Sequence, residues 1–291
     1  MRLTPRALLF AIMKILSPAK INLFLHVIGK RSDGYHELVT LMCPIGLYDT
    51  VSIGFDVRET TVTCNHPQVP QNEKNLAYKA AVCFFNALKK QERVKIFIDK
   101  HIPVSAGLGG GSSNAAVVFL GLNRHYGSPF SQKDLMAMGL SLGADVPFFI
   151  YRKPAIATGI GEKLKSYEGP LPFRILLVYP GFEVSTAAIY KNLNLGLTKY
   201  KNKHSCNRFT KQNFDVANHL YNDLEAVTSS MYPDVQVVKE ALLRRGANGV
   251  LMSGSGPTVF GLFYDSDKAR EAYGFLSQNK QWQVYLADLI V

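Results

Sequence analysis

The chain has 291 residues, of which 47% are hydrophobic and 19% are charged. These proportions exclude a disordered or fibrous protein, and the length is sufficient for two globular domains with a continuous core. The formal net charge of +11 indicates an anionic partner, which a nucleic acid, an acidic membrane or a phosphorylated metabolite could each provide.

Residues 1–12 carry a short apolar run that superficially resembles a signal peptide. Because Lys14 interrupts the run and no convincing cleavage site follows, we expect the native chain to start at Met13. No stretch approaches the ~20 uninterrupted apolar residues that a membrane-crossing helix needs. A cytoplasmic protein without a membrane partner is therefore expected.

The four cysteines are widely scattered and show no Cys-x-x-Cys spacing (Cys43, Cys64, Cys83 and Cys206). Neither a zinc site nor a disulfide framework is predicted, which fits a reducing compartment. The densest basic tract, from Lys199 to Lys211, lacks the helical or aromatic organisation of a surface that reads nucleic acid. We predict that this tract is a solvated loop.

The first half of the chain mixes strands and helices. Strands are predicted at residues 21–28, 51–53 and 94–98, where apolar residues alternate or run together. A helix is predicted over residues 75–90, because Asn75 can cap its first turn and apolar residues recur on one face.

Residues 103–116 place glycines and serines directly before an alanine-rich helix. Glycine lets the backbone approach a bulky anion, and the first amides of a helix are unpaired at the positive end of its macrodipole. The segment therefore predicts a phosphate-binding loop, in which Ser112 and Ser113 cap the helix or contact a phosphate or its metal. A tight strand-to-helix turn without a ligand is the alternative.

Two better-known phosphate motifs do not describe this segment. No lysine follows the glycines as in a Walker A loop, and Ser112 stands where the dinucleotide fingerprint has its last glycine.

A second candidate functional segment follows the next helix, which we predict over residues 132–142 between a Ser131 cap and a stop at Gly143. Residues 143–147 predict a turn that holds Asp145 and leads into an apolar strand.

A cluster of glycines and prolines over residues 159–172 marks a transition between two predicted domains, residues 1–165 and 166–291. The second domain is predicted to contain a strand at 173–179, a helix from Pro233 to a stop at Gly246, a glycine-rich hairpin across 252–258, a helix at 267–276 and a final strand at 283–290.

Three segments, taken in order, resemble the GHMP kinase superfamily: 18–23, 103–116 and 253–258. Four segments, 18–25, 31–37, 109–116 and 143–148, are most similar to the branch whose substrate is a cytidine diphosphate derivative of methylerythritol, on the non-mevalonate route to isoprenoids. The resemblance implies an α+β fold, with an N-terminal domain like ribosomal protein S5 domain 2 and a ferredoxin-like C-terminal domain. It also implies phosphorylation of a substrate hydroxyl by ATP, with Mg²⁺ neutralising phosphate charge.

Phosphoryl transfer needs an oriented hydroxyl, a group that accepts its proton, and positive charge around the moving phosphoryl group. The resemblance implies that Asp145 serves the proton and that Lys20 lies beside it, polarising the attacking oxygen. Whether Asp145 is a true general base or chiefly an electrostatic positioner stays open. Taken singly, a turn-forming aspartate and an exposed lysine are equally good readings.

For the nucleotide, the resemblance implies that the glycine-rich loop wraps the ATP phosphates, with Asn75 and Lys100 beside the adenine. The loop residues are Pro103, Val104, Ser105, Ala106, Gly107, Leu108, Gly109, Gly110, Gly111, Ser112 and Ser113. No Walker B carboxylate or Asp-Phe-Gly motif identifies a protein ligand for Mg²⁺, so no metal ligand is assigned.

For the second substrate, the resemblance implies that Tyr35 stacks on the cytosine and His36 hydrogen-bonds to it, with Asn22 near the methylerythritol end. Thr186 and Tyr190 match second-domain positions beside the cytidine and methylerythritol groups. The alternatives are a structural Tyr-His pair, and a helix cap followed by a core tyrosine.

The expected partners are ATP and a small-molecule substrate, in a monomer or weak homodimer, with no nucleic acid and no membrane. One alternative is a kinase of the same superfamily that acts on homoserine, mevalonate or a sugar. Another is a noncatalytic protein that binds nucleic acid, which the basic charge balance permits.

Overall fold

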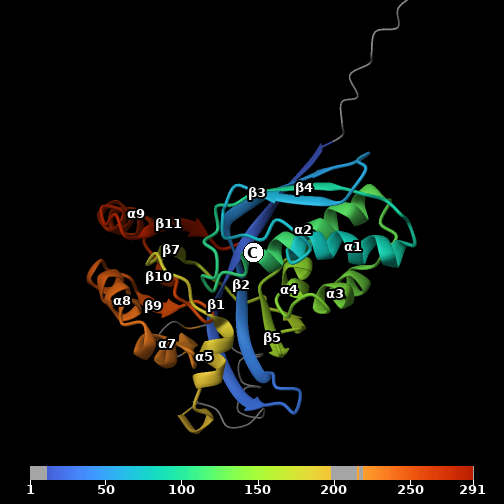
Figure 1. The fold of residues 1–291 in the computed structure, drawn as a ribbon. Coiled ribbons are helices and arrows are strands. Elements are labelled where there is room, and N and C mark those ends of the chain that lie inside the picture. Colours follow the sequence, from blue (N-terminus) through green and yellow to red (C-terminus); the bar gives the residue numbers. More distant parts are fainter. Residues whose placement is uncertain (1–11, 198–214, 216–218, 291) are drawn as a thin grey trace, which may run out of the picture.

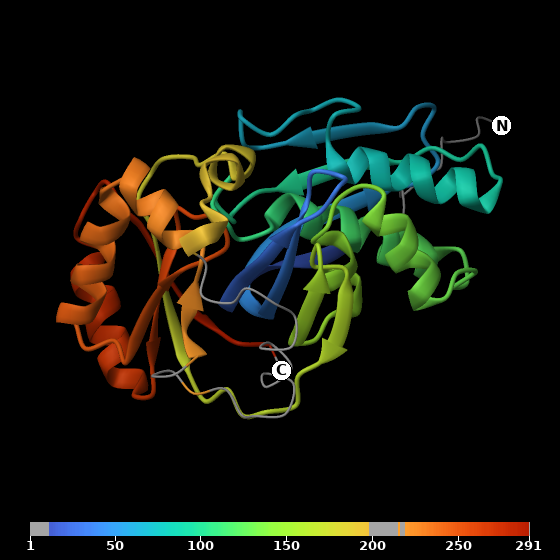
Figure 2. The same ribbon diagram turned by 90° about the horizontal axis from the view of Figure 1, so that it is seen from below.

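Two β-sheets pack against each other, and helices cover the outer face of each (Figure 1 and Figure 2). The computed structural model describes residues 12–197, 215 and 219–290. In this part of the chain the first sheet has seven strands and the second has four.

Two long antiparallel strands form the centre of the first sheet, β1 (Ile12–Lys30) and β2 (His36–Gly54). The strands predicted at 21–28 and 51–53 are parts of β1 and β2. The predicted ranges cover only part of these strands. Both faces of each strand are buried over long stretches, so apolar and polar residues do not alternate there.

The other strands extend this sheet in the order β3-β4-β2-β1-β8, with β5 paired to β2 and β6 paired to β5. Their bounds are β3 (Thr61–Cys64), β4 (Lys95–Asp99), β5 (Ala155–Gly159), β6 (Lys163–Ser166) and β8 (Tyr221–Asn222).

Four helices cover the outer face of the first sheet (Figure 1): α1 (Leu76–Leu88), α2 (Gly110–His125), α3 (Gln132–Leu140) and α4 (Val146–Tyr151). The two predicted caps are confirmed. Asn75 Oδ1 accepts a hydrogen bond from the Ala77 N–H, and Ser131 forms a capping box with Asp134.

The strand predicted after Asp145 is wrong, because residues 146–151 form helix α4. Pro147 lies in the first turn of this helix, where its missing N–H costs nothing. The run is apolar because the helix is buried against α2 and α3. A short apolar run has no period that separates a buried strand from a buried helix.

The second sheet has the strand order β11-β7-β10-β9, with every pair antiparallel. Two helices cover its outer face (Figure 2), so the chain order β7-α8-β9-β10-α9-β11 gives a ferredoxin-like arrangement. The bounds are β7 (Arg174–Tyr179), α8 (Asp234–Arg244), β9 (Gly249–Met252), β10 (Val259–Phe263), α9 (Ser266–Leu276) and β11 (Gln283–Asp288).

Strand β7 shows how the two sheets share a core. Ile175 and Leu177 belong to an apolar cluster with β1 and β2 of the first sheet, whereas Leu176 and Val178 pack with α8 and α9. This alternation is the period of two of a strand that is buried on both faces.

Short elements lie between β7 and α8 in the chain: α5 (Thr186–Asn192), the 3-10 helix η1 (Leu195–Leu197), β8 and α7 (Glu225–Met231). The predicted domain boundary after residue 165 falls at the end of β6. Strand β8 returns to the first sheet, so the second predicted domain contributes one short strand to the first.

Two predictions concern residues outside the described part of the chain. One is that residues 1–12 precede the native start at Met13, and the other is the solvated loop over 199–211. In the part of the chain that is described, no helix is long and apolar enough to cross a membrane.

Candidate active site

A cavity of about 1080 Å³ is lined by residues from both halves of the chain. Among its described lining residues Asp145 is the single carboxylate, whereas five are lysines (Lys20, Lys30, Lys74, Lys100 and Lys191). This excess of positive charge suits an anionic, phosphorylated ligand.

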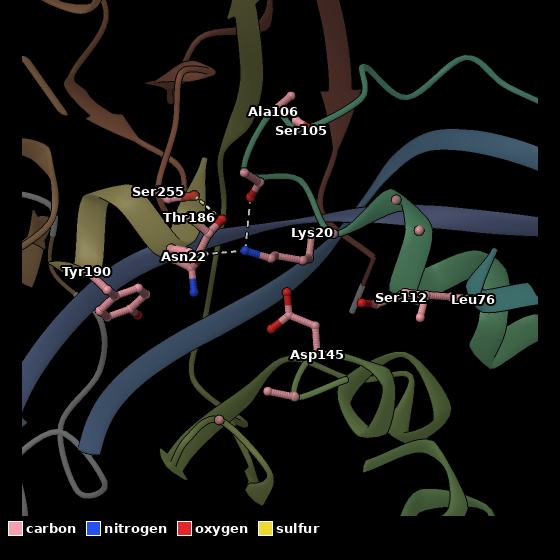
Figure 3. Close-up of a pocket in the computed structure, with 18 of the residues that line it drawn as sticks. Lys20, Asn22, Leu76, Ser105, Ala106, Ser112, Asp145, Thr186, Tyr190 and Ser255 are labelled. Atoms are coloured by element: carbon pink, nitrogen blue, oxygen red, sulfur yellow. Dashed lines mark hydrogen bonds between the residues drawn. The ribbon is translucent and has the colours of Figure 1, made fainter. Parts of the chain in front are cut away.

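Lys20 lies in β1 with its ammonium group at the cavity (Figure 3). Nζ donates hydrogen bonds to Asn22 Oδ1 at 2.7 Å and to the Gly107 carbonyl at 2.9 Å. Burial lowers the pKa of Lys20, and the nearby charge of Asp145 opposes that shift. The lysine predicted from its motif is therefore a buried, oriented charge and not an exposed one.

Asp145 precedes helix α4 in the N-cap position, yet its side chain makes no capping hydrogen bond. The carboxylate instead points toward Lys20 across the cavity (Figure 3). An aspartate at a helix start usually satisfies the first backbone N–H groups. Here the carboxylate faces the cavity, where a ligand could use its acceptor oxygens.

Lys20 and Asp145 lie in Figure 3 between Tyr190 on one side and Ser112 and Leu76 on the other. The cavity thus has two ends, one at the start of α2 and one at α5, with the lysine and the carboxylate between them. Such an arrangement can hold two ligands whose reacting groups meet at the centre.

The glycine-rich loop reaches α2 through residues that need to be glycine. Gly107 has φ of +77°, and a Cβ on it would lie 2.1 Å from the Ser253 carbonyl oxygen. Gly109, with φ of +70°, is the N-cap of α2, and a Cβ there would lie 2.8 Å from the Phe149 ring. The loop therefore packs directly against both the second-domain turn and α4, with the N–H groups of the first turn of α2 at the cavity.

Nine of the eleven predicted loop residues line the cavity (Pro103, Val104, Ser105, Ala106, Gly107, Gly109, Gly110, Gly111 and Ser112). Leu108 and Ser113 do not. The Ser113 hydroxyl is fully buried and accepts a hydrogen bond from Ser17 Oγ at 2.8 Å. Of the two serines, only Ser112 offers its hydroxyl to the cavity.

Asn75 and Lys100 both line the cavity, but their side chains already have protein partners. Asn75 caps α1 and donates to the Pro70 carbonyl. Lys100 Nζ donates to Asp49 Oδ2 at 2.8 Å and to the Ile102 carbonyl. Their proximity to an adenine ring stays a prediction.

The structure brings Tyr190 to the predicted pair of Tyr35 and His36. The His36 ring stacks on Tyr190 with 4.9 Å between centroids, and Tyr35 lines the same end of the cavity with 58% of its surface exposed. Burial and the charge of Lys30 lower the pKa of His36, which favours the neutral ring.

Asn22 and Thr186 are held by neighbours that the sequence did not single out. Asn22 Nδ2 donates to Thr40 Oγ1 at 2.8 Å, and the Thr186 and Ser255 hydroxyls are 2.8 Å apart. Thr40 lies in a buried strand and carries no motif. Ser255 lies in the 253–258 motif, which could have indicated it.

No cluster of three or more His, Cys, Asp or Glu side chains that could hold a metal ion occurs among the described residues. Asp145 and Ser112 both line the cavity and carry side-chain oxygens. A Cβ on Gly143, two residues before Asp145, would lie 3.8 Å from Ser112 Oγ, so the two segments adjoin.

The family model of the GHMP kinases N terminal domain matches residues 75–153, and that of the GHMP kinases C terminal matches residues 211–280. The two models define the class of the chain as a GHMP kinase. A solved homoserine kinase from Cytophaga hutchinsonii shares the fold, with a TM-score of 0.71 at 19% identity over 99% of this chain and 98% of that one.

Closer relatives narrow the class. A 4-diphosphocytidyl-2-C-methyl-D-erythritol kinase from Syntrophotalea carbinolica is 47% identical over 94% of this chain and 97% of its own. A crystal structure of 4-(cytidine 5'-diphospho)-2C-methyl-D-erythritol kinase has a TM-score of 0.78 at 34% identity, covering 95% of this chain and 99% of that one. The chain belongs to the 4-diphosphocytidyl-2-C-methyl-D-erythritol kinase family. The predicted resemblance and the predicted α+β fold are both confirmed.

Proposed function

We propose that the protein transfers the γ-phosphoryl group of ATP to the 2-hydroxyl group of 4-diphosphocytidyl-2-C-methyl-D-erythritol, a step toward isoprenoid precursors. The observation that carries the proposal is the placement of the buried Lys20 ammonium and the Asp145 carboxylate, which makes no capping hydrogen bond, at the centre of a two-ended cavity. The two methylerythritol kinases named above, and not the homoserine kinase, carry this cytidine derivative in their names, which supplies the identity of the alcohol.

The reacting hydroxyl lies between Lys20 and Asp145. Its oxygen forms a bond to the γ-phosphorus while the bond from that phosphorus to the bridging oxygen of ADP breaks. The hydroxyl proton passes to the Asp145 carboxylate, and the Lys20 ammonium stabilises the negative charge that develops on the attacking oxygen.

The N–H groups in the first turn of α2 hold the ATP phosphates, since they have no partner within the helix and lie at its positive end. Mg²⁺ fits this site because it keeps most of its water and phosphate ligands and needs only one or two protein oxygens. Ser112 and Asp145 offer these oxygens. When bound, the ion neutralises charge on the phosphates.

Tyr35, His36 and Tyr190 hold the cytidine end of the alcohol substrate, with the neutral His36 ring as a hydrogen-bonding group. Asn22 and Thr186 lie nearer to Lys20 and contact the methylerythritol portion (Figure 3). The protein acts in the cytoplasm as a monomer or weak homodimer, without a nucleic acid or a membrane.

Competition between alcohols tests the substrate assignment. We expect kcat/KM for 4-diphosphocytidyl-2-C-methyl-D-erythritol to exceed that for homoserine or mevalonate by at least about 100-fold, because those alcohols leave the cytidine end of the cavity empty. An equal or higher kcat/KM with homoserine or mevalonate would retain the kinase class and reject this substrate.

A further inference from the structure

A fully buried carboxylate, Asp49 of β2, lies beneath the glycine-rich loop and uses both of its oxygens. Oδ1 accepts hydrogen bonds from the backbone N–H groups of His101 and Ile102, each at 2.8 Å. Oδ2 accepts from Lys100 Nζ at 2.8 Å and from Asn114 Nδ2 at 2.9 Å. A buried carboxylate is tolerated only when it is paired and hydrogen-bonded in this way.

The four donors come from the two ends of the phosphate loop. Lys100, His101 and Ile102 immediately precede it, and Asn114 follows it in α2. The packing between the two ends is close, since a Cβ on Gly110 would lie 2.8 Å from Lys100 Nζ. Hydrogen bonds to Asp49 therefore connect residues 100–102, which precede the loop, with Asn114, which follows it.

The same network continues to the strand that carries Lys20. Ser17 Oγ of β1 accepts a hydrogen bond from Asn114 Nδ2 at 2.9 Å and donates one to Ser113 Oγ at 2.8 Å. Ser17 lies three residues before Lys20 in the sequence. The start of α2 is thus tied both to Asp49 and to β1.

We propose that Asp49 is a positioning residue for ATP: it holds residues 100–102 and Asn114 so that the first-turn N–H groups of α2 stay directed at the phosphates. This inference rests on the proposed function of the loop. A charged carboxylate is required, because an asparagine at this position has one acceptor oxygen and would turn its NH₂ group toward two further donors. Lys100 acts with Asp49, which compensates its buried ammonium.

Calorimetric titration of the full chain with a non-hydrolysable ATP analogue and Mg²⁺ tests this role without the alcohol substrate. We expect Asp49→Asn to raise the Kd of the analogue by at least about tenfold, because small displacements of binding groups are costly. At saturating ATP, the KM of the alcohol substrate should stay within about twofold of wild type.

The matched control is Asn123→Ala at the other end of α2. Asn123 is also buried, and it exchanges two hydrogen bonds with the Phe130 backbone, far along the helix from the loop. We expect both variants to melt at lower temperature, but only Asp49→Asn to lose affinity for the analogue.

Wild-type affinity in folded Asp49→Asn would overturn the proposal, as would an equal loss of affinity in Asn123→Ala. If Asp49→Asn does not fold, Asn114→Ala replaces it, since it removes one donor and leaves the ion pair intact. Unchanged affinity in Asn114→Ala would then overturn the proposal. Because the calorimetric titrations contain no alcohol, the affinities that they measure are independent of whether the identity of the alcohol is correct.

Discussion

We predict that the charge of Lys20 makes the reaction sensitive to alkaline pH. Burial sets the pKa of this lysine below its ordinary value of 10.5. Transfer needs the charged form, so activity is present below the lowered pKa and is lost as pH rises through it. We expect kcat of the wild type to fall at alkaline pH. The Lys20→Arg variant should have a lower kcat that does not fall over the same pH range, because a guanidinium stays protonated. Superimposable alkaline limbs in pH profiles of the two proteins would contradict this role.

The Tyr190 ring is expected to bind the cytidine end of the substrate through its face. Tyr190→Ala should raise the KM of the cytidine substrate by about tenfold or more, since stacking on a base contributes about 1–3 kcal/mol. Tyr190→Phe keeps the face and should stay near wild type, and the KM of ATP should not change in either variant. Steady-state kinetics with each substrate varied in turn gives the answer, and a normal KM in the alanine variant would exclude Tyr190 from this end of the site.

At the scale of elements, the glycine-rich loop depends on its contact with the turn between β9 and β10. Gly107→Ala places a Cβ against the Ser253 carbonyl, whereas Gly127→Ala has a similar φ of +78° and open space around the new Cβ. The strain of a left-handed residue alone costs about 1–2 kcal/mol. We expect both variants to lose about that much stability in urea unfolding, and Gly107→Ala to lose more and also to bind ATP weakly. Equal behaviour of the two would show that the contact does not matter.

Elements with local signals could be predicted from the sequence, and the others could not. Asn75 and Ser131 predict the starts of their helices, because a helix cap is an interaction between residues that are close in the sequence. Helix α4 was not predicted, because its apolar residues pack against other helices. The sequence of its six residues alone does not indicate that packing. Asp145, which precedes this helix, was nevertheless singled out as a candidate through its motif.

At the scale of the whole molecule, the apolar cluster shared by the two sheets predicts a single cooperative unfolding transition. Trp282 is the sole tryptophan and packs against the second sheet and its helices. Its fluorescence therefore reports the unfolding of that part, whereas far-UV circular dichroism reports the unfolding of the whole chain. The midpoints of the two signals should coincide in a urea titration. An earlier midpoint for fluorescence would mean that the second sheet unfolds independently and that the shared core is weak.

The site combines segments that are distant in sequence, such as Lys20 with Gly107 and Gly107 with Ser253. No pattern within one segment predicts these contacts, and only the resemblance of several motifs to one superfamily joined them beforehand. Residues without a motif were therefore missed. Thr40 and Asp49 act through hydrogen bonds to other residues, and buried polar side chains in a strand have no signature in one sequence.

We propose that Lys20 and Asp145 together promote the transfer of the γ-phosphoryl group from ATP to the cytidine alcohol. Phosphorus NMR of the protein with ATP, Mg²⁺ and 4-diphosphocytidyl-2-C-methyl-D-erythritol tests it most directly, with Asp145→Asn as the matched variant. The wild type should give ADP and a new phosphomonoester signal. Asp145→Asn should still bind ATP but should form both products more slowly than the wild type. A phosphomonoester formed equally fast by Asp145→Asn, or no product from folded wild type that binds ATP, would contradict the account.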